Sequence, residues 1–230
     1  REAEKEADII IWDGGNNDFS FYLPDLEIVV VDPHRAGDEL SYYPGEVNFK
    51  RADVIIINKM DTAEDSAVQF VKENIHTCNA GAVVIEACSP VHAEQGKSIS
   101  GQRVLVVEDG PTLTHGGMKY GAGTLAAKQY GAKEIIDPRP WLTGTLVDTF
   151  KKYPEIGNLL PAMGYGNEQI RDLEQTINKS DCDLVVIGTP IDLARVINIQ
   201  KPSVRVTYEL EEVGTPNLET ILKPFIDNVV

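Results

Sequence analysis

Val54-Ile55-Ile56-Ile57 runs without interruption into Asn58-Lys59-Met60-Asp61, and this junction decides the fold. Four consecutive branched apolar residues predict a strand buried on both faces, which is typical of a parallel sheet covered by helices. Polar side chains at the end of such a strand lie where open α/β sheets bind ligands. We therefore predict an α/β fold with a mainly parallel sheet layered with helices. Further strands are expected at 28–31, 82–87, 104–107, 134–136, 184–187 and 204–208.

The tetrapeptide Asn58-Lys59-Met60-Asp61 resembles the segment that reads the guanine base in P-loop GTPases. In those proteins the aspartate accepts hydrogen bonds from two ring-edge N–H groups, while the asparagine and the lysine stem fix the loop and cover the ring. The alternative is a polar loop that leads into the next helix, which Thr62 can cap. The residues at the end of the following strand resemble the last base-contacting loop of the same proteins. The predicted nucleotide-binding residues are Asn58, Lys59, Asp61, Ala87 and Cys88.

Near the start of the chain, Ile9-Ile10-Ile11-Trp12 leads into Asp13, and the run predicts a buried strand over 8–12. A hydrophobic strand that ends in aspartate has the form of a Walker B element, whose carboxylate holds Mg²⁺ through water. The glycines at 14 and 15 would let the backbone approach a phosphate closely. We predict Asp13 as a metal-binding and catalytic residue. The alternative is that it begins a Gly-Gly-Asn turn.

The sequence contains no G-x-x-x-x-G-K-[ST] phosphate loop. Gly96-Lys97-Ser98 has the required ending, but Val91 stands where the first glycine is needed, so we interpret this segment as an ordinary turn. The chain opens at Arg1 on charged residues that lead directly into the predicted strand at 8–12. We therefore expect residues 1–100 to be the distal part of a P-loop NTPase-like domain whose phosphate loop lies on a preceding segment. On that interpretation, the chain alone binds nucleotide poorly or not at all.

A turn-rich stretch at 89–102 places a domain boundary near residue 101. Residues 101–230 are predicted to form a second, substrate-binding α/β domain. Pro224 is expected to kink or end its last helix. The helices of this domain are expected near 121–131, 144–152 and 167–179, and from Asn217 onward.

Residues 108–123 are rich in glycine, leave a predicted strand and enter a predicted helix. Their hydroxyl, imidazole and ammonium groups suit phosphate or carboxylate oxygens, and the start of the helix adds its dipole. The alternative is a flexible loop with a hydrogen-bonded histidine. We predict His115 and Lys119 as catalytic. The substrate contacts predicted in this segment are Thr112, Thr114, His115, Gly116, Gly117 and Lys119.

Two proline-stiffened loops, Asp32-Pro33-His34-Arg35 and Asp137-Pro138-Arg139-Pro140, each hold an arginine after an aspartate. Arginine grips phosphate or carboxylate groups through two parallel hydrogen bonds. We therefore predict His34, Arg35 and Arg139 as further substrate contacts. The alternative is an Asp–Arg pair that only fixes the loop.

The 230 residues carry 21 Lys and Arg against 36 Asp and Glu, for a formal net charge of −15. Nucleic acids and anionic membranes attract basic surfaces, so neither is an expected partner. No apolar run approaches the ~20 residues of a membrane span. The three cysteines suit a reducing compartment, so we predict a cytoplasmic protein. A zinc site built from His76, Cys78, Cys88 and His92 matches no common ligand spacing.

Several blocks of the sequence resemble archaeal cyclic 2,3-diphosphoglycerate synthetases and their bacterial relatives. The similarity implies an intracellular P-loop enzyme that uses ATP and Mg²⁺. It would close an intramolecular phosphoanhydride in 2,3-diphosphoglycerate and release ADP and phosphate. The blocks that carry the resemblance are Asp13–Asp18, Asp32–Arg35, Glu108–Gly123, Asp137–Pro140, Leu160–Gly166 and Gly188–Leu193.

The expected partners are therefore a nucleotide and a small anionic phosphorylated metabolite, and a homodimer is compatible with the sequence. By its geometry, the Asn58–Asp61 segment predicts GTP in place of the ATP that the resemblance implies. Two alternatives stay open. One is a GTPase of the metallochaperone type, and the other is a regulatory module that binds a phosphorylated metabolite without chemistry.

Overall fold

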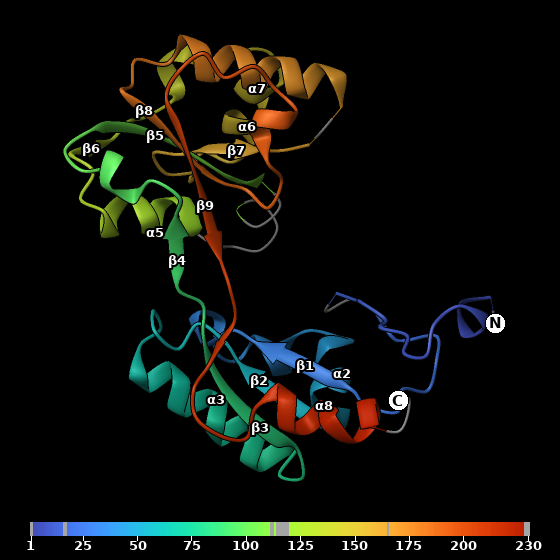
Figure 1. Ribbon diagram of the computed structural model, residues 1–230. Coiled ribbons are helices and arrows are strands. Elements are labelled where there is room, and N and C mark those ends of the chain that lie inside the picture. The colour runs from blue at the N-terminus through green and yellow to red at the C-terminus, as the bar shows by residue number, and fades with distance from the viewer. Residues whose placement is uncertain (1, 16–17, 111–112, 114–119, 165, 228–230) are drawn as a thin grey trace. The chain divides into compact units, whose positions relative to one another are not determined.

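The computed structural model describes residues 2–15, 18–110, 113, 120–164 and 166–227, which fold into two compact units (Figure 1). Unit 1 comprises Arg1–Pro90 and Glu209–Val230, and unit 2 comprises Val91–Tyr208. The predicted boundary near residue 101 therefore differs from the division in the structure. The final segment also returns to unit 1 and does not stay with the second domain.

Unit 1 contains a four-stranded sheet in the order β1-β2-β3-β10. The first three strands are parallel and in register, and β10 runs antiparallel to β3. This last pairing is what draws the C-terminal segment into unit 1. The strands are β1 (Ile28–Val31), β2 (Val54–Ile57), β3 (Val83–Cys88) and β10 (Glu211–Glu212).

The central strand β2 is buried along its whole length, as its sequence predicts. Ile55 and Ile57 pack in one cluster with Val71 of α3, and Val54 and Ile56 belong to a second cluster that includes residues of α8. The strand thus has apolar layers on both faces, which explains why its sequence does not alternate between apolar and polar residues. The helices of unit 1 are α1 (Asp38–Ser41), α2 (Gly45–Arg51), α3 (Asp65–Cys78) and α8 (Leu218–Asp227), with 3₁₀ turns η1 (Ala3–Lys5) and η2 (Pro33–Arg35).

Unit 2 is built on a six-stranded sheet in the order β4-β9-β8-β5-β6, with β7 also paired to β5. Strands β5, β6, β7, β8 and β9 form parallel pairs, and only β4 with β9 is antiparallel among the described strands of this unit. The strands are β4 (Val91–Ala93), β5 (Arg103–Asp109), β6 (Glu134–Ile135), β7 (Leu160–Ala162), β8 (Leu184–Gly188) and β9 (Ser203–Tyr208).

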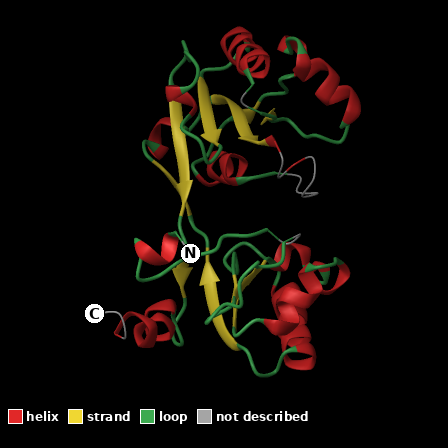
Figure 2. Cartoon of the chain, turned by 90° about the vertical axis from the view of Figure 1, so that its right-hand side faces the viewer, coloured by secondary structure: helices red, strands yellow, loops and turns green. Residues whose placement is uncertain are grey.

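Helix α5 covers one face of this sheet, while α6 and α7 pack together over the other (Figures 1 and 2). All three helices contribute to one apolar core with β5 and β8. The α/β prediction is therefore confirmed in both units, and its P-loop NTPase-like part stays a prediction. The helices and 3₁₀ turns of unit 2 are η3 (Gly96–Ser98), α5 (Ala122–Gln129), η4 (Arg139–Trp141), α6 (Thr145–Lys152), α7 (Asn167–Lys179) and η5 (Leu193–Arg195).

The predicted buried strand over 8–12 is wrong. These residues form no strand, and Ile11 is 87% exposed. A strand in the middle of a sheet needs neighbours for its backbone hydrogen bonds, and no described strand pairs with this run. No helix in the described part of the chain combines the length and the apolar character needed to cross a bilayer.

Candidate functional site

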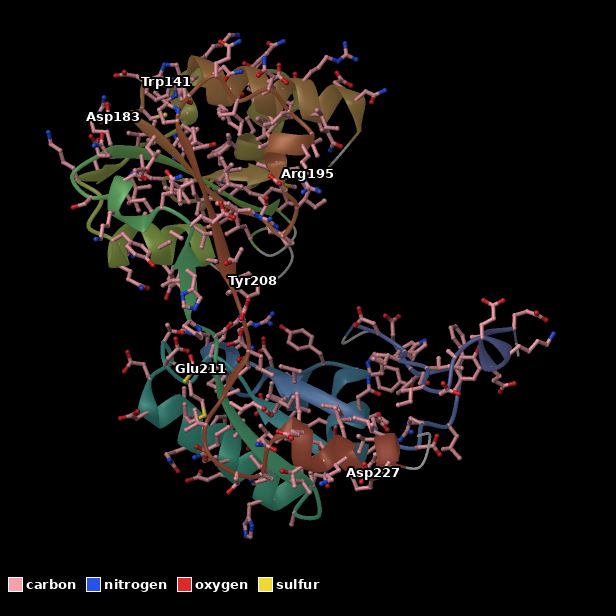
Figure 3. The ribbon with its side chains drawn as sticks, in the orientation of Figure 1. Trp141, Asp183, Arg195, Tyr208, Glu211 and Asp227 are labelled. Atoms are coloured by element: carbon pink, nitrogen blue, oxygen red, sulfur yellow. The ribbon has the colours of Figure 1, made fainter. Side chains whose placement is uncertain are left out.

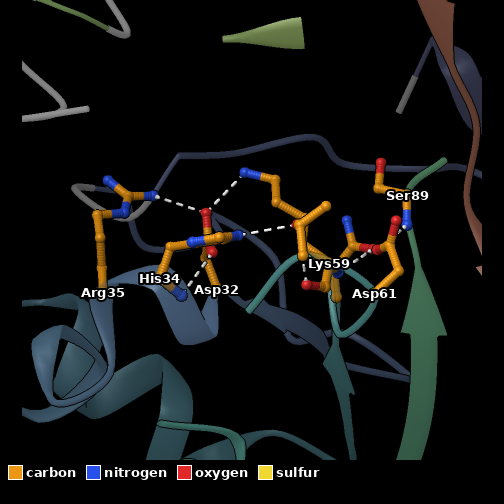
Figure 4. Close-up of polar contacts among 8 residues, drawn as sticks. Asp32, His34, Arg35, Lys59, Asp61 and Ser89 are labelled. Atoms are coloured by element: carbon orange, nitrogen blue, oxygen red, sulfur yellow. Dashed lines mark hydrogen bonds and ion pairs between the residues drawn. The ribbon is translucent and has the colours of Figure 1, made fainter. Parts of the chain in front are cut away.

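Polar side chains follow β1, β2 and β3 at the carboxyl ends of the three parallel strands of unit 1 (Figure 4). Asp32 follows β1, Asn58 follows β2, and Ser89 follows β3. Because parallel strands end at the same edge of a sheet, these residues come together there. The edge joins the predicted nucleotide-binding residues to the predicted substrate contacts of the β1 loop.

Asp32 is the organising residue of this edge, and its carboxylate is largely buried. Its Oδ2 atom lies 2.6 Å from Lys59 Nζ and 3.9 Å from the Arg35 guanidinium. Its Oδ1 atom accepts a hydrogen bond of 3.0 Å from the His34 backbone N–H. One carboxylate therefore holds the 3₁₀ turn η2 after β1 and the lysine after β2. The Asp–Arg pairing that was the alternative for this loop is present, with Lys59 as the closer partner.

His34 and Thr62 connect the same two loops a second time. His34 Nε2 lies 2.9 Å from Thr62 Oγ1, and the Thr62 hydroxyl donates a 3.3 Å hydrogen bond to the Lys59 carbonyl oxygen. Thr62 therefore does not cap the following helix. Helix α3 begins at Asp65 after Glu64, whose side chain makes no capping hydrogen bond.

Lys59 has a positive φ of 58°, and no other non-glycine residue in the described chain has one. The left-handed conformation costs a residue with a Cβ atom about 1–2 kcal/mol. The loop offsets this cost locally, because Asn58 Oδ1 accepts a 2.8 Å hydrogen bond from the Lys59 N–H. Backbone strain of this kind is concentrated at ligand-binding sites, so its position here marks this loop as a functional candidate.

Asp61 connects the β2 loop to the end of β3. Its Oδ1 atom accepts a 3.0 Å hydrogen bond from the Ser89 N–H, and the Met60 N–H donates a 3.1 Å bond to the Ala87 carbonyl. Burial raises the pKa of the nearby Cys88 thiol, and the charge of Asp61 adds to that rise, whereas a hydrogen bond with the Asp61 backbone opposes it. The five predicted nucleotide-binding residues are thus gathered in one place. Their arrangement presents a fixed carboxylate at the surface of unit 1.

Asp13 lies apart from this pattern, because it is exposed and follows no strand. The form of a Walker B element therefore is absent from the described structure around it, and metal binding by Asp13 stays a prediction. Within the described residues, no three His, Cys, Asp or Glu side chains are grouped as a metal site would require. The described donor set thus does not fit a metal held by protein side chains alone.

Arg139 of unit 2 makes the contacts of a residue that fixes its own loop. Its guanidinium lies 2.9 Å from Asp137 Oδ1, donates to the carbonyl oxygens of Pro154 and Ile156, and stacks 4.9 Å from the Phe150 ring centre. These contacts correspond to the alternative considered from the sequence. Its role as a substrate contact stays a prediction.

Glu108 was not among the predicted site residues, yet it dominates the polar contacts at the end of β5. Its side chain is 1% exposed, and its oxygens accept hydrogen bonds from the backbone N–H groups of Gly121, Gly123 and Thr124 and from the Thr124 hydroxyl. The first amides of α5 are therefore bound by a carboxylate of the protein itself. Burial raises the pKa of Glu108, and the four hydrogen bonds oppose that rise.

This arrangement changes the interpretation of the glycine-rich segment. We expected the start of the helix to attract a substrate anion, but its amides already have a partner in Glu108. The detectable signal was an acidic residue in the apolar run of β5, followed by glycines that allow close approach. A Cβ atom at Gly121 would lie 2.6 Å from a Glu108 oxygen, and one at Gly188 would lie 2.5 Å away. The predicted residues Thr112, Thr114, His115, Gly116, Gly117 and Lys119 lie outside the described residues.

The chain has a close relative among known proteins, although it matches no family model. The chain is 62% identical over 228 residues to a protein of Thermococcus kodakarensis named "Arginine synthetase ArcE". The match covers 99% of this chain and 51% of that protein, so the chain spans about half the length of the curated relative it matches.

Proposed function

We propose that this chain is part of a nucleotide-dependent synthetase whose product is arginine, and that the Asn58–Asp61 loop reads the base of the nucleotide. Support for a synthetase comes from the 62% identity with the arginine synthetase over nearly the whole chain. The earlier resemblance to cyclic 2,3-diphosphoglycerate synthetases also points to a synthetase, with a different product. The chain spans about half of that relative, and the part of the activity that we propose for it is binding of nucleotide and substrate.

The observation that carries the nucleotide proposal is the fixed position of Asp61. Its carboxylate is held by the Ser89 N–H at the edge of a parallel sheet, next to a strained lysine. Guanine presents two adjacent N–H donors on its ring edge, which match the two oxygens of a carboxylate. Adenine presents an unprotonated ring nitrogen beside its amino group, and that lone pair repels a carboxylate. The loop therefore favours a guanine nucleotide.

Asp32 and Lys59 have a supporting role in this proposal. Their ion pair, 2.6 Å long and partly buried, fixes the lysine whose neighbours form the base-reading loop. The exposed Arg35 lies within 3.9 Å of the same carboxylate and carries positive charge to the edge of the sheet. Mg²⁺, when bound with a nucleotide, neutralises phosphate charge. The described residues offer no grouped ligands for it, so we assign no step through the metal.

The sequence has no phosphate loop, so we expect binding of nucleotide by this chain to be weak. Isothermal titration calorimetry with GTP, GDP, ATP and XTP, each with Mg²⁺ and at concentrations high enough to detect weak binding, tests the base-reading role. We expect Asp61→Asn to weaken GTP binding by about 10- to 100-fold, because a charged hydrogen-bond acceptor is lost. The same variant should strengthen XTP binding, since the amide donates to the carbonyl that xanthine carries in place of the guanine amino group. Asp65→Asn removes the same negative charge from an exposed position on α3, so it is the matched control. Binding of ATP alone, unaffected by Asp61→Asn, would contradict base reading by this loop.

The product is tested separately by titrating arginine, lysine and 2,3-diphosphoglycerate into the chain with the preferred nucleotide present. A synthetase binds its product, so arginine should bind and lysine should not. Binding of 2,3-diphosphoglycerate without arginine would favour cyclic diphosphoglycerate chemistry and reject the arginine proposal. The product titration and the Asp61 test use different ligands, so either proposal can fail while the other stands.

A further inference from the structure

Arg205 of unit 2 lies in β9, at the place where the neighbouring strand β8 ends. Its partner in the parallel register is Ile187, the second-last residue of β8. Val204 and Val206, on either side of Arg205, are buried. Because side chains alternate along a strand, Arg205 points to the opposite face of the sheet, which it shares with Ile187. A cation is thus placed beside the carboxyl end of a parallel strand, where open α/β sheets bind ligands.

The guanidinium of Arg205 has more hydrogen-bond donors than the described part of the structure uses. Its Nη2 atom donates a 3.3 Å hydrogen bond to the carbonyl oxygen of Pro190, in the loop after β8. Its Nε atom is buried, and no described group accepts a hydrogen bond from it. Among the buried side-chain nitrogen and oxygen atoms of the described residues, only this one has no partner. A buried donor without an acceptor destabilises a fold, and a charged donor does so more, so the atom calls for an explanation.

Arg205 also forms no ion pair with a carboxylate of the described residues, although the chain carries a net charge of −15. Arg171 forms none either, but it is exposed on α7, where water solvates it, whereas Arg205 is partly buried. The other described arginines each pair with an aspartate or glutamate; they are Arg35, Arg51, Arg103, Arg139 and Arg195. The position of Arg205 therefore suits a negative charge that comes from outside the chain.

We propose that Arg205 binds the carboxylate of the substrate or product, through its Nε–H and an Nη–H. This inference rests on the proposed function, since it names the residue that would hold the carboxylate of arginine. The two N–H groups on one side of a guanidinium are parallel and match the two oxygens of a carboxylate. One guanidinium also balances the single charge of a carboxylate, whereas a phosphate dianion is better matched by two cations. Arg195, in the turn after β8, already pairs with Asp192.

Calorimetry with L-arginine and agmatine, under the conditions of the product titration, tests the proposal, because agmatine is arginine without its carboxylate. The wild type should bind arginine about 10- to 100-fold more tightly than agmatine, the effect of hydrogen bonds between charged groups. Arg205→Lys keeps the charge but loses the paired N–H groups, so most of this preference should disappear. Arg195→Lys is the matched control. Arg195, labelled in Figure 3, is 85% exposed, and its substitution should leave the preference unchanged.

The competing explanation is that Arg205 only fixes the loop after β8, through the Pro190 carbonyl. In that case Arg205→Lys lowers the free energy of unfolding in urea but keeps the preference of the wild type for arginine over agmatine. This result would overturn the proposal, because a carboxylate contact must appear in the comparison of the two ligands.

The Nε–H resonance of Arg205, assigned by NMR in the wild type, gives a second test that needs no variant. Arginine and acetate should shift this resonance to saturation, and inorganic phosphate should not. Arginine that binds by calorimetry without shifting the resonance would overturn the carboxylate contact and leave the proposed product intact. If arginine does not bind and acetate still shifts the resonance, the proposed product fails and the carboxylate site stands. A response to phosphate as strong as that to acetate, or no response to any of the three, would also overturn the proposal.

Discussion

Replacing Glu108 by glutamine or alanine distinguishes a carboxylate that stabilises α5 from one that is merely buried. Oε1 accepts from the Gly121 N–H at 3.1 Å, from the Thr124 N–H at 2.7 Å and from the Thr124 hydroxyl at 2.8 Å. Oε2 accepts from the Gly123 N–H at 3.2 Å. Glutamine can keep the first three bonds through its oxygen, but its NH₂ group then faces the Gly123 donor. Alanine leaves all four donors without a partner.

These contacts set the expected size of the effect. A buried donor left unpaired costs about 1–3 kcal/mol. Glu108→Gln should therefore lower the free energy of unfolding of unit 2 by about 1–3 kcal/mol. Glu108→Ala should lower it by at least about twice as much, since it also leaves a cavity beside β5. The order of the two variants is the decisive part of the prediction, because measured costs do not add simply.

Urea denaturation followed by Trp141 fluorescence measures the effect. The sequence has two tryptophans, so a Trp12→Phe background leaves Trp141 of unit 2 as the only tryptophan reporter. An alanine variant as stable as the glutamine variant would refute the interpretation that Glu108 satisfies the start of α5. So would two variants that both unfold like the parent protein.

The difference in unfolding free energy between the wild type and Glu108→Gln should depend on pH. Burial raises the pKa of Glu108 above its ordinary value of 4.5, so the folded state binds this proton more tightly than the unfolded state. The corresponding stability is fully present below 4.5 and is lost as the pH rises through the folded pKa. The wild type should therefore lose stability relative to Glu108→Gln as the pH rises from 4 to neutral. A difference independent of pH would show that the group does not titrate in the folded state as described.

Three further changes probe other parts of the chain. Asp172→Ala should lower the unfolding free energy of unit 2 by about 2–3 kcal/mol in the same urea titration. The reason is that Asp172 Oδ2 accepts two hydrogen bonds of 2.8 Å, from the N–H and the hydroxyl of Thr145 at the start of α6. Asp172→Asn can keep both bonds and should lower the unfolding free energy less. Lys59→Gly should be at least as stable as Lys59→Ala, the reverse of the usual order, because of the positive φ; thermal unfolding compares them. Asp61→Asn should accelerate alkylation of Cys88 at pH 8, followed by mass spectrometry, since removing the neighbouring charge lowers the raised pKa of the thiol.

The sequence predicted best those elements whose signals are local. The bounds of β1 and β2 match the expected strands, and α7 matches the expected helix over 167–179. The α8 cap at Asn217 is also confirmed, since its side chain accepts a 2.9 Å hydrogen bond from the Thr220 N–H. Pro224, expected to kink or end α8, lies inside the helix. These elements depend on apolar periodicity and capping, and both are determined by residues close together in the sequence.

The errors concern contacts between distant segments. The run at 8–12 has the composition of a buried strand, but burial requires neighbouring strands that its own sequence cannot supply. The return of the C-terminal segment depends on β10 pairing with β3, across more than a hundred residues, and on α8 packing over β2. Among the candidate site residues, the β1 and β2 loops were predictable as partners because consecutive parallel strands place their carboxyl ends together.

Glu108 shows why a glycine-rich turn before a helix cannot by itself identify an anion site. Helix N-terminal amides bind a negative charge, and glycines allow that charge to approach closely. Neither requirement distinguishes a substrate from a carboxylate on the preceding strand. In this chain Glu108, the second-last residue of β5, provides the charge, and Gly121, Gly123 and Gly188 leave room for it. An acidic residue at the end of a buried strand, directly before such a turn, is therefore evidence that the amides are already bound, and ligand binding must then be sought at other edges. In unit 1 the corresponding polar edge is held by Asp32 and Asp61, and there Asp61 is exposed, as the proposed base-reading role requires.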